Sequence, residues 1–385
     1  MVDVVVTGIG LVSALGTLKP SWQSLLVGES GIGLCQPFLE LPKRPLAIVE
    51  QKPTTLKWLT QQAVAAAIED ANISTPAPDC GVVIGSSRGA QATWEQLAQE
   101  CVLAGTPTPS AGNGQIDWLD TLPHQGAIAA AHQIGATGIV LAPMAACATG
   151  IWAIAQGFEL IQTNQCQRVI AGAVEAPITP LTLAGFHKMG ALARTGSYPF
   201  DRQREGLVLG EGGAVLVLES AELARERSAA VYGQILGFGL TADAYHVSAP
   251  DPNRKSAIAA VWHCLRRSHL APTNIDYIHA HGTGTQLNDQ HEAQLIEKVF
   301  ARKVPVSSTK GATGHTLGAS GALGTALCLM SLKHQILPPN VGLTESVFDL
   351  DLITTPRHSQ IRHALCFSFG FGGQNAVLSL KRWKY

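Results

Sequence analysis

Charged side chains are scarce in this sequence, and their two signs nearly cancel. Only 14% of the residues are Asp, Glu, Lys or Arg, and the formal net charge is −1. No run of five or more basic residues occurs. The chain therefore offers no strong positive field to nucleic acid, and we expect no nucleic-acid partner.

Closely paired cysteines are also missing. The eight cysteines are spread along the chain without CxxC or CxxH spacing. Free thiols are typical of a reducing compartment, whereas structural zinc sites use closely spaced Cys and His ligands. The sequence therefore predicts neither a disulfide framework nor a resident metal.

Long hydrophobic runs are absent as well. The apolar start, MVDVVVTGIGLVSALG, contains Asp3 and several glycines but no basic leader, which favours a buried strand and turn over a secretory signal. No other run reaches the roughly 18 apolar residues of a membrane span. We expect a cytoplasmic protein without a membrane span.

Hydrophobic residues make up 46% of the 385-residue chain. A single core stops growing at roughly 250 to 300 residues, so the length predicts two halves or a duplicated fold. With so little charge, part of the surface should be covered by another subunit. We therefore expect an oligomer.

Short β-branched runs alternate with longer alanine-rich segments, a pattern typical of layered α/β architecture. The runs predict buried strands at residues 2–7, 81–84, 138–141, 168–171, 214–218, 275–279, 304–307 and 376–380. Helical spacing occurs at residues 56–72, 150–163, 254–269, 289–301 and 317–335. Residues 88–127, rich in glycine, proline and polar side chains, predict loops with short helices.

Two segments of the chain share a weak pattern that indicates an internal duplication. Residues 145–150 and 311–321 each form a small-residue loop that carries a reactive side chain and opens an alanine-rich helix. The seam should lie in the polar stretch 221–230. This pattern predicts an N-terminal half at residues 1–225 and a C-terminal half at residues 226–385.

Cys147 lies in MAACATG, between a predicted strand and a predicted helix. At a helix N-terminus, backbone N–H groups and the helix dipole favour a thiolate, so this position predicts a lowered thiol pKa and a nucleophilic cysteine. The alternative is a buried structural cysteine, because free cysteine is among the most buried residue types.

Three further motifs contain residue types suited to catalysis. His281 lies in HAHGTGT, Lys310 and His315 lie in STKGATGH, and FSFGFGGQN near the C-terminus predicts a loop whose N–H groups could approach a reacting atom. Each motif has an ordinary alternative: a loop or structural histidine, a solvated lysine, or a plain hairpin turn.

Taken in order, ACATG, HGTGT, TKGATGH and FGFGG resemble the β-ketoacyl synthase family, in its elongating Cys-His-His type rather than the initiating Cys-His-Asn type. The resemblance covers nearly the whole chain and includes RVIAGAVEAPITPLTLAGF, YPFDRQREGLVLGEGGAVLVLES and DAYH. It implies a thiolase-like α/β fold, duplicated in a five-layer α-β-α-β-α arrangement with mixed sheets. It also implies an acyltransferase that performs decarboxylative Claisen condensation in fatty-acid elongation.

The same resemblance implies roles for particular residues. Cys147 would be the acylated nucleophile, His281 and His315 would activate the malonyl thioester, and Lys310 would hold their surroundings in place. The acidic partners of the lysine would be Asp289 and Glu292. Backbone N–H groups of Cys147 and Phe371 would form the oxyanion hole, with the Phe371 ring as a gate. Substrate contacts are implied for Phe186, Thr283, Thr285, Phe369 and Gly372.

The resemblance implies no cofactor and no metal beyond the phosphopantetheine of an acyl carrier protein, which would be the partner, together with a homodimer. The sequence departs from the family pattern at Gly324, where a glutamate is usual, and its basic stretch before residue 56 is reduced to Lys52 and Lys57. Two alternatives stay open: a ketosynthase of a specialised polyketide or glycolipid pathway, and a non-catalytic partner similar to a chain-length factor. A thiolase proper or a cysteine hydrolase fits the motifs less well.

Overall fold

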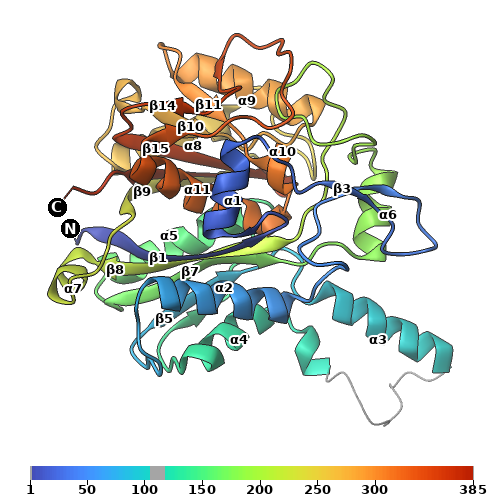
Figure 1. The fold of residues 1–385 in the computed structure, drawn as a ribbon, viewed down its shortest axis with the longest axis horizontal. Helices are drawn as coiled ribbons and strands as arrows, with labels where there is room; N and C mark the ends of the chain where they lie inside the picture. Colours follow the sequence, from blue (N-terminus) through green and yellow to red (C-terminus); the bar gives the residue numbers. More distant parts are fainter. Residues whose placement is uncertain (1, 105–117, 385) are drawn as a thin grey trace.

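A computed structural model describes residues 2–104 and 118–384 of the chain. Figure 1 shows five stacked layers, in which two sheets alternate with three layers of helices. Helices α2 (Leu56–Asp70) and α4 (Gln125–Ile134) cover one outer side, and α8 (Lys255–Arg267) and α9 (Gln286–Val299) cover the other. Helices α5 (Thr149–Gln162) and α11 (Ser320–His334) lie between the sheets. The predicted layered α/β arrangement is confirmed.

The two sheets repeat one strand order. The first runs β1-β8-β7-β5-β6, the second runs β9-β16-β15-β10-β11, and in each the first three strands are antiparallel and the last three parallel. The first set is β1 (Val4–Ser13), β8 (Gly212–Ser220), β7 (Arg168–Glu175), β5 (Gly81–Gly85) and β6 (Val140–Leu141). The second is β9 (Gly233–Ala242), β16 (Gln374–Lys381), β15 (His363–Gly370), β10 (Tyr277–His279) and β11 (Pro305–Ser307).

This repetition is the predicted duplication in structural form. Strands β1 and β9 also pair at Val4 and Ile235, which joins the halves into one continuous twelve-stranded sheet that includes β2 (Gly16–Thr17) and β13 (Asp351–Leu352). The boundary between residues 225 and 226 stays a prediction.

The central position of α11 follows from its composition. Its sequence, SGALGTALCLMSLKH, has apolar or small residues on every face, and every residue from Ser320 to Leu332 is buried. A helix that is hydrophobic all round must be covered on all sides. Packing against β15 on one side and β8 on the other provides that cover and places the start of α11 at the centre of the molecule.

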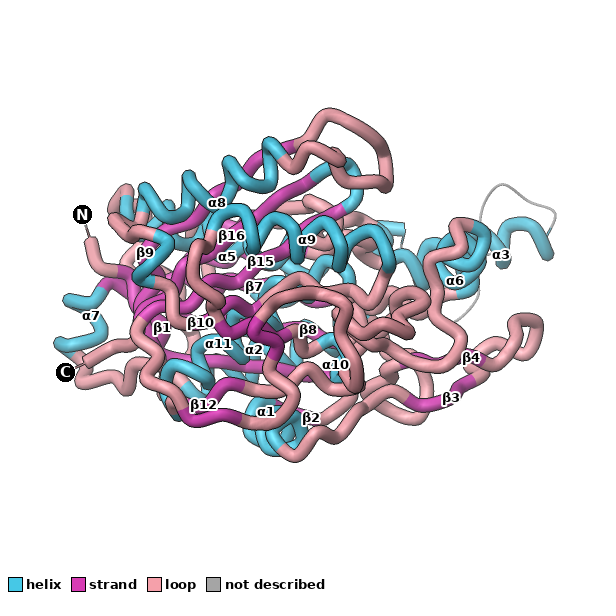
Figure 2. Tube along the Cα trace, turned by 90° about the horizontal axis from the view of Figure 1, so that it is seen from above, coloured by secondary structure: helices cyan, strands magenta, loops and turns pink. Residues whose placement is uncertain are grey.

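The remaining elements surround this core. They are α1 (Leu18–Leu26), α3 (Gln91–Ala104), α6 (Pro180–Lys188), α7 (Ala221–Glu226), α10 (Lys310–Thr313), β3 (Gly33–Cys35), β4 (Arg44–Leu46), β12 (Ile336–Leu337), β14 (Arg357–His358) and the short helices η1 (Trp118–Thr121), η2 (Pro272–Asn274), η3 (Leu317–Ala319) and η4 (Phe371–Gly373). Figure 2 shows α3, α6 and the β3–β4 pair at one end of the molecule and both termini at the other. No helix among the described residues has the length and apolar character needed to cross a membrane.

Two predictions are corrected. Residues 88–127 were predicted as loops with short helices, but α3 is a helix of 14 residues; residues 105–117 of that region lie outside the described part. In FSFGFGGQN, strand β15 continues to Gly370 and β16 begins at Gln374, so only Phe371–Gly373 form the turn. Antiparallel pairing with β16 holds this segment extended, and glycine in a strand marks a close backbone approach. A Cβ atom on Gly370 would lie 3.0 Å from the backbone nitrogen of Cys147.

Candidate active site

Cys147 lies in a tight turn two residues before the first residue of α5. The hydroxyl of Thr149 accepts a hydrogen bond from Ala145 N–H (2.8 Å) and donates one to the Ala146 carbonyl (2.6 Å), while Ser368 donates to the Cys147 carbonyl (2.8 Å). Ala146 has a left-handed backbone with φ 47°. Such strained positions persist where the surrounding structure enforces them, often at functional sites. The predicted placement near a helix N-terminus is confirmed.

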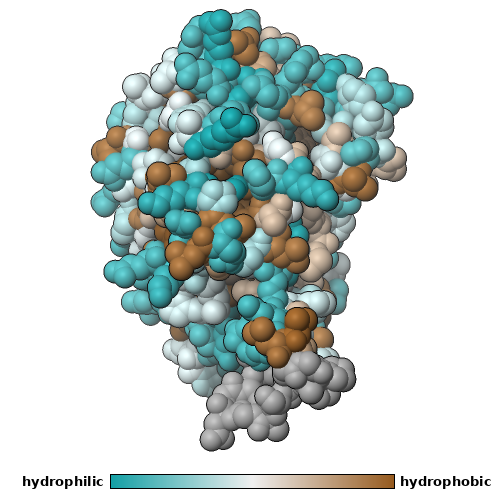
Figure 3. Space-filling model, turned by 90° about the vertical axis from the view of Figure 1, so that its right-hand side faces the viewer, coloured by the Kyte–Doolittle hydropathy of each residue, from teal (hydrophilic) through white to brown (hydrophobic). Residues whose placement is uncertain are grey.

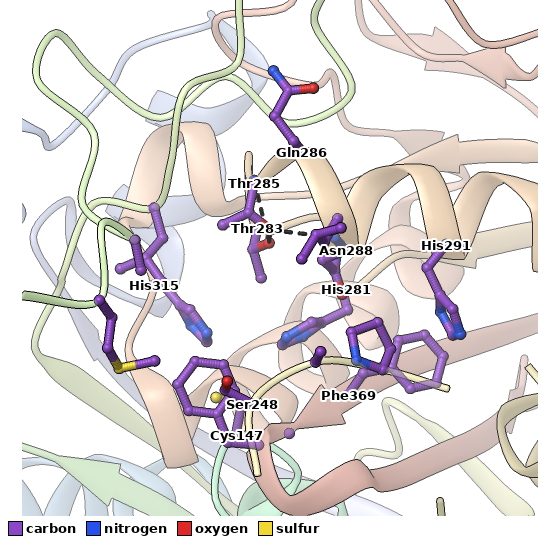
Figure 4. Close-up of a pocket in the computed structure, with 18 of the residues that line it drawn as sticks. Cys147, Ser248, His281, Thr283, Thr285, Gln286, Asn288, His291, His315 and Phe369 are labelled. Atoms are coloured by element: carbon purple, nitrogen blue, oxygen red, sulfur yellow. Dashed lines mark hydrogen bonds between the residues drawn. The ribbon is translucent and has the colours of Figure 1, made fainter. Parts of the chain in front are cut away.

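Two histidines from the C-terminal half meet this cysteine. The Cys147 sulfur and one ring nitrogen each of His281 and His315 all lie within 4.8 Å of one another. The imidazole rings are 5.3 Å apart between centroids and nearly perpendicular, at 81°. Figure 4 shows both rings pointing into the space beside Cys147. The fold therefore gathers three motifs at one point, although Cys147 precedes both histidines by more than a hundred residues.

His315 follows α10, and its position is fixed by backbone and side-chain contacts. Its N–H donates to the Val208 carbonyl (2.7 Å) and its carbonyl accepts from Gly210 N–H (3.0 Å). Its Nδ1 atom is hydrogen-bonded to the Ser320 hydroxyl at 2.9 Å. Because Nδ1 is occupied, Nε2 is the ring nitrogen left to face a substrate.

His281 follows β10 and is held mainly by Lys310. The Lys310 ammonium donates to the His281 carbonyl and lies 3.5 Å from His281 Nδ1. Glu292 accepts hydrogen bonds from the N–H groups of His281 (2.6 Å) and Gly282 (2.7 Å). These contacts fix the backbone of the loop that carries the histidine.

The predicted acidic residues act mainly on the backbone of the HGTGT loop. Asp289 accepts from the N–H groups of Thr283 (3.0 Å) and Phe200 (2.8 Å). Within the described residues, neither Asp289 nor Glu292 forms a contact ion pair with Lys310. Their effect on the lysine is therefore electrostatic, acting through a buried and weakly screened environment.

Burial sets the protonation state of both histidines. Each side chain is only 2% exposed. Burial lowers the pKa of His281 and of His315 well below the ordinary value, and the positive charge of Lys310 lowers it further. Both rings are therefore neutral at neutral pH, and each can donate one N–H hydrogen bond.

The pKa of Cys147 moves in the direction opposite to the sequence prediction. Burial raises it to about 11, although the positive charges of Lys310 and Arg88 lower it in part. The nearby carboxylate of Glu175 raises it further. Loss of hydration outweighs the helix end, so the thiol is protonated at neutral pH and its proton must be removed before the sulfur attacks. A neutral imidazole beside the sulfur can accept that proton.

The glycine-rich turn lies against the cysteine. The backbone N–H of Phe371 lies near the Cys147 sulfur and lowers the thiol pKa in part. The Phe371 ring stacks at a tilt on Phe186, with 6.0 Å between centroids, and both side chains pack in one cluster with Cys147. Two aromatic rings therefore form an apolar wall beside the sulfur.

A cavity of about 320 Å³ joins these groups. Among its lining residues are the predicted Cys147, His281, His315, Thr283, Thr285, Phe186, Phe369 and Phe371. Lys310 lies behind the histidines at 4% exposure. Gly372 belongs to the same turn but does not line the cavity, so its predicted substrate contact has no counterpart in the cavity wall.

Several cavity residues were not predicted as site residues, among them Asp243, His291 and Asn375. Asn375 donates to Asp243 (2.7 Å), and His291 Nε2 lies 3.2 Å from the Asp251 carbonyl. A signal for His291 existed, because it lies three residues after Asn288 on α9 and shares the helix face that meets the cavity. Asp243 was visible only as part of the DAYH resemblance.

Glu175 is a further unpredicted residue behind the site. This fully buried carboxylate accepts hydrogen bonds from the Ser86 hydroxyl (2.6 Å) and from the N–H groups of Ser87 (2.8 Å), Arg88 (3.0 Å) and Gly318 (3.0 Å). It thereby ties the loop after β5 to η3, the short helix just before α11. A single acid at the end of the apolar strand RVIAGAVE was the available signal.

Comparison with known proteins agrees with this geometry. Residues 51–224 match the model of the β-ketoacyl synthase N-terminal domain, and residues 232–344 match that of the C-terminal domain. The chain is 34% identical to 3-oxoacyl-[acyl-carrier-protein] synthase 2 of Coxiella burnetii over 98% of each protein.

Solved structures agree as well. The ishigamide ketosynthase/chain length factor superposes with a TM-score of 0.91 at 26% identity over 100% of both chains. A type II PKS ketosynthase, solved with its acyl-carrier protein, gives a TM-score of 0.90 at 26% identity over 99% of this chain and 100% of that one. The predicted thiolase-like fold is confirmed. The chain belongs to the β-ketoacyl synthase family.

Proposed function

We propose that this protein is a β-ketoacyl-acyl-carrier-protein synthase, which extends a carrier-bound acyl chain by two carbons taken from a malonyl group. One observation carries the proposal: a thiol and two neutral imidazoles meet within 4.8 Å in a cavity. A cysteine hydrolase needs one histidine and an orienting group, whereas two neutral histidines beside the thiol suit activation of a second thioester.

In the first half-reaction, the Cys147 sulfur attacks the thioester carbonyl of an acyl-carrier protein. The thiol proton passes to a neighbouring imidazole, and the carbonyl oxygen becomes an oxyanion that accepts hydrogen bonds from the N–H groups of Cys147 and Phe371. The carrier thiol leaves after it takes up a proton, and the acyl group stays on Cys147.

In the second half-reaction, the malonyl thioester oxygen accepts hydrogen bonds from His281 and His315. These bonds stabilise the enolate that forms when the carbon–carboxylate bond breaks and carbon dioxide leaves. The enolate carbon attacks the acyl-Cys147 carbonyl, a carbon–carbon bond forms, and the cysteine thiolate departs. Neutral rings suit this step because each supplies a donor N–H without requiring proton transfer.

The cavity wall suggests how the two substrates enter. Thr283 and Thr285, whose hydroxyls are 2.9 Å apart, would contact the amide-rich phosphopantetheine arm of the carrier. Phe186 and Phe371 border the sulfur and would contact the apolar acyl chain. Because the arm arrives with each substrate, the enzyme needs no resident cofactor.

The proposed assembly is a homodimer in the cytoplasm with an acyl carrier protein as partner. Strand β6 ends the described sheet with an open edge, where Leu141 in the strand and Met144 just after it are 37% and 55% exposed. An open edge with apolar side chains is a surface that a second copy can cover by strand pairing. Figure 3 shows another side of the molecule, where apolar side chains form separate patches among hydrophilic ones.

A second candidate is a ketosynthase of a specialised polyketide pathway. The observation that favours it is the likeness to the ishigamide and type II PKS ketosynthase structures over nearly the whole chain. The chemistry at Cys147 would be unchanged, and only the acyl group would differ. A non-catalytic partner is disfavoured because Cys147, His281, Lys310 and His315 are all present and in contact range.

The test is product formation on the carrier. Purified protein is mixed with acyl-carrier proteins of graded chain length and malonyl-carrier protein, and the carriers are analysed by intact mass. We expect a β-ketoacyl product, with the preferred chain length separating fatty-acid elongation from a specialised role. No product with any carrier, from folded protein, would refute the proposal, and Cys147→Ser is the matched inactive control.

A further inference from the structure

Cys147, His281 and His315 also form a set of metal ligands. Within the described part of the chain, this is the set of thiol, imidazole or carboxylate side chains close enough together to share one metal ion. All three are buried, with exposures of 8%, 2% and 2%. Their donor atoms point into a common space, as Figure 4 shows.

The donor set suits zinc. A thiolate and two imidazoles form a mixed sulfur–nitrogen set of the kind found in zinc enzymes. With zinc–sulfur and zinc–nitrogen bonds of about 2.3 and 2.0 Å, tetrahedral ligands lie roughly 3.3 to 3.6 Å apart. The present donors lie within 4.8 Å of one another, so side-chain movements of about an ångström close the site.

The surroundings of the ligands favour metal binding as well. In metal sites, the second nitrogen of a ligating histidine is held by a hydrogen bond that fixes the ring. His315 has this arrangement, because its Nδ1 contacts the Ser320 hydroxyl at 2.9 Å. The cavity supplies an open fourth position for water, as in catalytic zinc sites with three protein ligands.

We propose that Zn²⁺ binds reversibly to Cys147, His281 and His315 and inhibits the enzyme. On binding, the cysteine thiol loses its proton to solvent and the sulfur bonds to the ion; no oxidation occurs. The ion occupies the nucleophile and both hydrogen-bond donors at once, so neither half-reaction can proceed. Binding rests on the donor geometry alone, whereas inhibition of condensation rests on the proposed function.

The positive charge of Lys310 should weaken zinc binding, which predicts the direction in which a variant of this residue changes the affinity. Its ammonium lies 3.5 Å from His281 Nδ1, so its charge repels a divalent cation bound on the other side of the ring. Lys310→Met should therefore bind zinc more tightly than the natural protein. Weaker binding in this variant would instead mean that Lys310 is needed to shape the ligand set.

Cobalt is the spectroscopic probe. The full-length protein, freed of metal with a chelator, is titrated with Co²⁺. We expect one ion per chain, a thiolate-to-cobalt charge-transfer band, and visible bands as intense as those of four-coordinate cobalt. Zinc should displace the cobalt and abolish these bands.

Variants of the ligands test the assignment. Cys147→Ser should lose the charge-transfer band, and Ser320→Ala should bind cobalt about 10- to 100-fold more weakly. Cys166→Ser, a buried cysteine outside the ligand set, is the matched control and should bind normally.

A second readout does not depend on enzymatic activity. Zinc should slow alkylation of Cys147 by iodoacetamide, measured by peptide mass spectrometry, while the more accessible Cys35 in the same sample reacts as before. No cobalt spectrum, or one that persists in Cys147→Ser, would overturn the site. Metal binding with full condensation activity would overturn the inhibition and leave the site intact. Metal binding in a protein that condenses no substrate would refute the proposed function alone.

Discussion

Cys147 is a residue at which burial and local charge compete. Its position near the N-terminus of α5 and the charges of Lys310 and Arg88 favour the thiolate, but the side chain is only 8% exposed and burial raises its pKa to about 11. The thiol is therefore protonated in the resting enzyme. This state protects the sulfur from oxidation and makes attack dependent on a neighbouring base.

The pH dependence of alkylation tests this account of the thiol. A raised pKa means that the thiolate fraction keeps growing as pH rises, so the rate of Cys147 alkylation by iodoacetamide should still increase above about pH 9, where an ordinary cysteine levels off. Peptide mass spectrometry gives the rate at each pH, with the urea-unfolded chain as reference. A plateau at or below about pH 8 would show that the helix end and the cations dominate instead.

The two histidines should affect the two half-reactions differently. His281→Ala and His315→Ala should each leave acyl-enzyme formation largely intact, because the remaining imidazole can accept the thiol proton. Condensation should fall by at least about 100-fold, because one of the two donors to the enolate is lost. Quenched-flow sampling with intact-mass detection separates the steps, and His132→Ala, an exposed histidine on α4, is the control. A histidine variant that condenses at the natural rate would contradict the assigned role.

At the scale of elements, α11 is packed so closely that one of its glycines has no room for a side chain. A Cβ atom on Gly324 would lie 2.7 Å from His279 Cε1 and 3.0 Å from the Cys366 sulfur. His279 is itself buried and bonded to Thr309, the residue before Lys310, at 3.1 Å. The space at Gly324, where the family usually has glutamate, is therefore filled by a histidine that supports the lysine segment.

Gly324→Ala should accordingly destabilise the protein. Overpacking a well-filled core costs about 1–3 kcal/mol, so the urea midpoint should fall. Gly185→Ala in α6 is the matched control, since a Cβ there meets no atom within 4 Å and alanine should stabilise that helix slightly. If both variants were equally stable, the close packing of His279 against α11 would be refuted.

Elements with a clear local signal could be predicted from sequence. The apolar runs that became β5, β7 and β8 and the alanine-rich segments that became α2 and α5 are long and regular. Strand β9 was missed because its three glycines, in GQILGFGLTA, weaken the β signal, and its partners β1 and β16 are distant in sequence. FSFG was predicted as a loop, but it is a strand because pairing with β16 outweighs the weak β propensity of its glycine.

The features of the site also differ in whether the sequence could predict them. Cys147, His281, Lys310 and His315 each stand in a local motif, so their positions could be predicted, although their catalytic roles stay predictions. The pKa of Cys147 could not, because desolvation arises from residues brought together by folding. Glu175 and Asp243 were missed for a related reason: their partners, such as Gly318 for Glu175 and Asn375 for Asp243, lie more than a hundred residues away.

At the scale of the whole molecule, the open edge of β6 is the surface at which we propose that two copies pair. Leu141→Lys places a charge on the apolar edge and should shift the protein from dimer toward monomer, because edge charges oppose strand pairing between copies. Light scattering coupled to size-exclusion chromatography gives the mass directly. Val347→Lys, an exposed apolar residue elsewhere on the surface, should leave the mass unchanged. A natural protein that is monomeric at all concentrations would contradict the dimer.

The central claim is that Cys147 carries the acyl group between two half-reactions. The most direct measurement is a pulse and chase on the protein itself: incubation with an acyl-carrier protein, intact-mass analysis with peptide mapping, and then addition of malonyl-carrier protein. The account predicts one acyl group on Cys147 after the pulse, its loss during the chase, and its appearance in a β-ketoacyl carrier product. An acyl group on another residue, or none on folded protein with any carrier, would contradict the account.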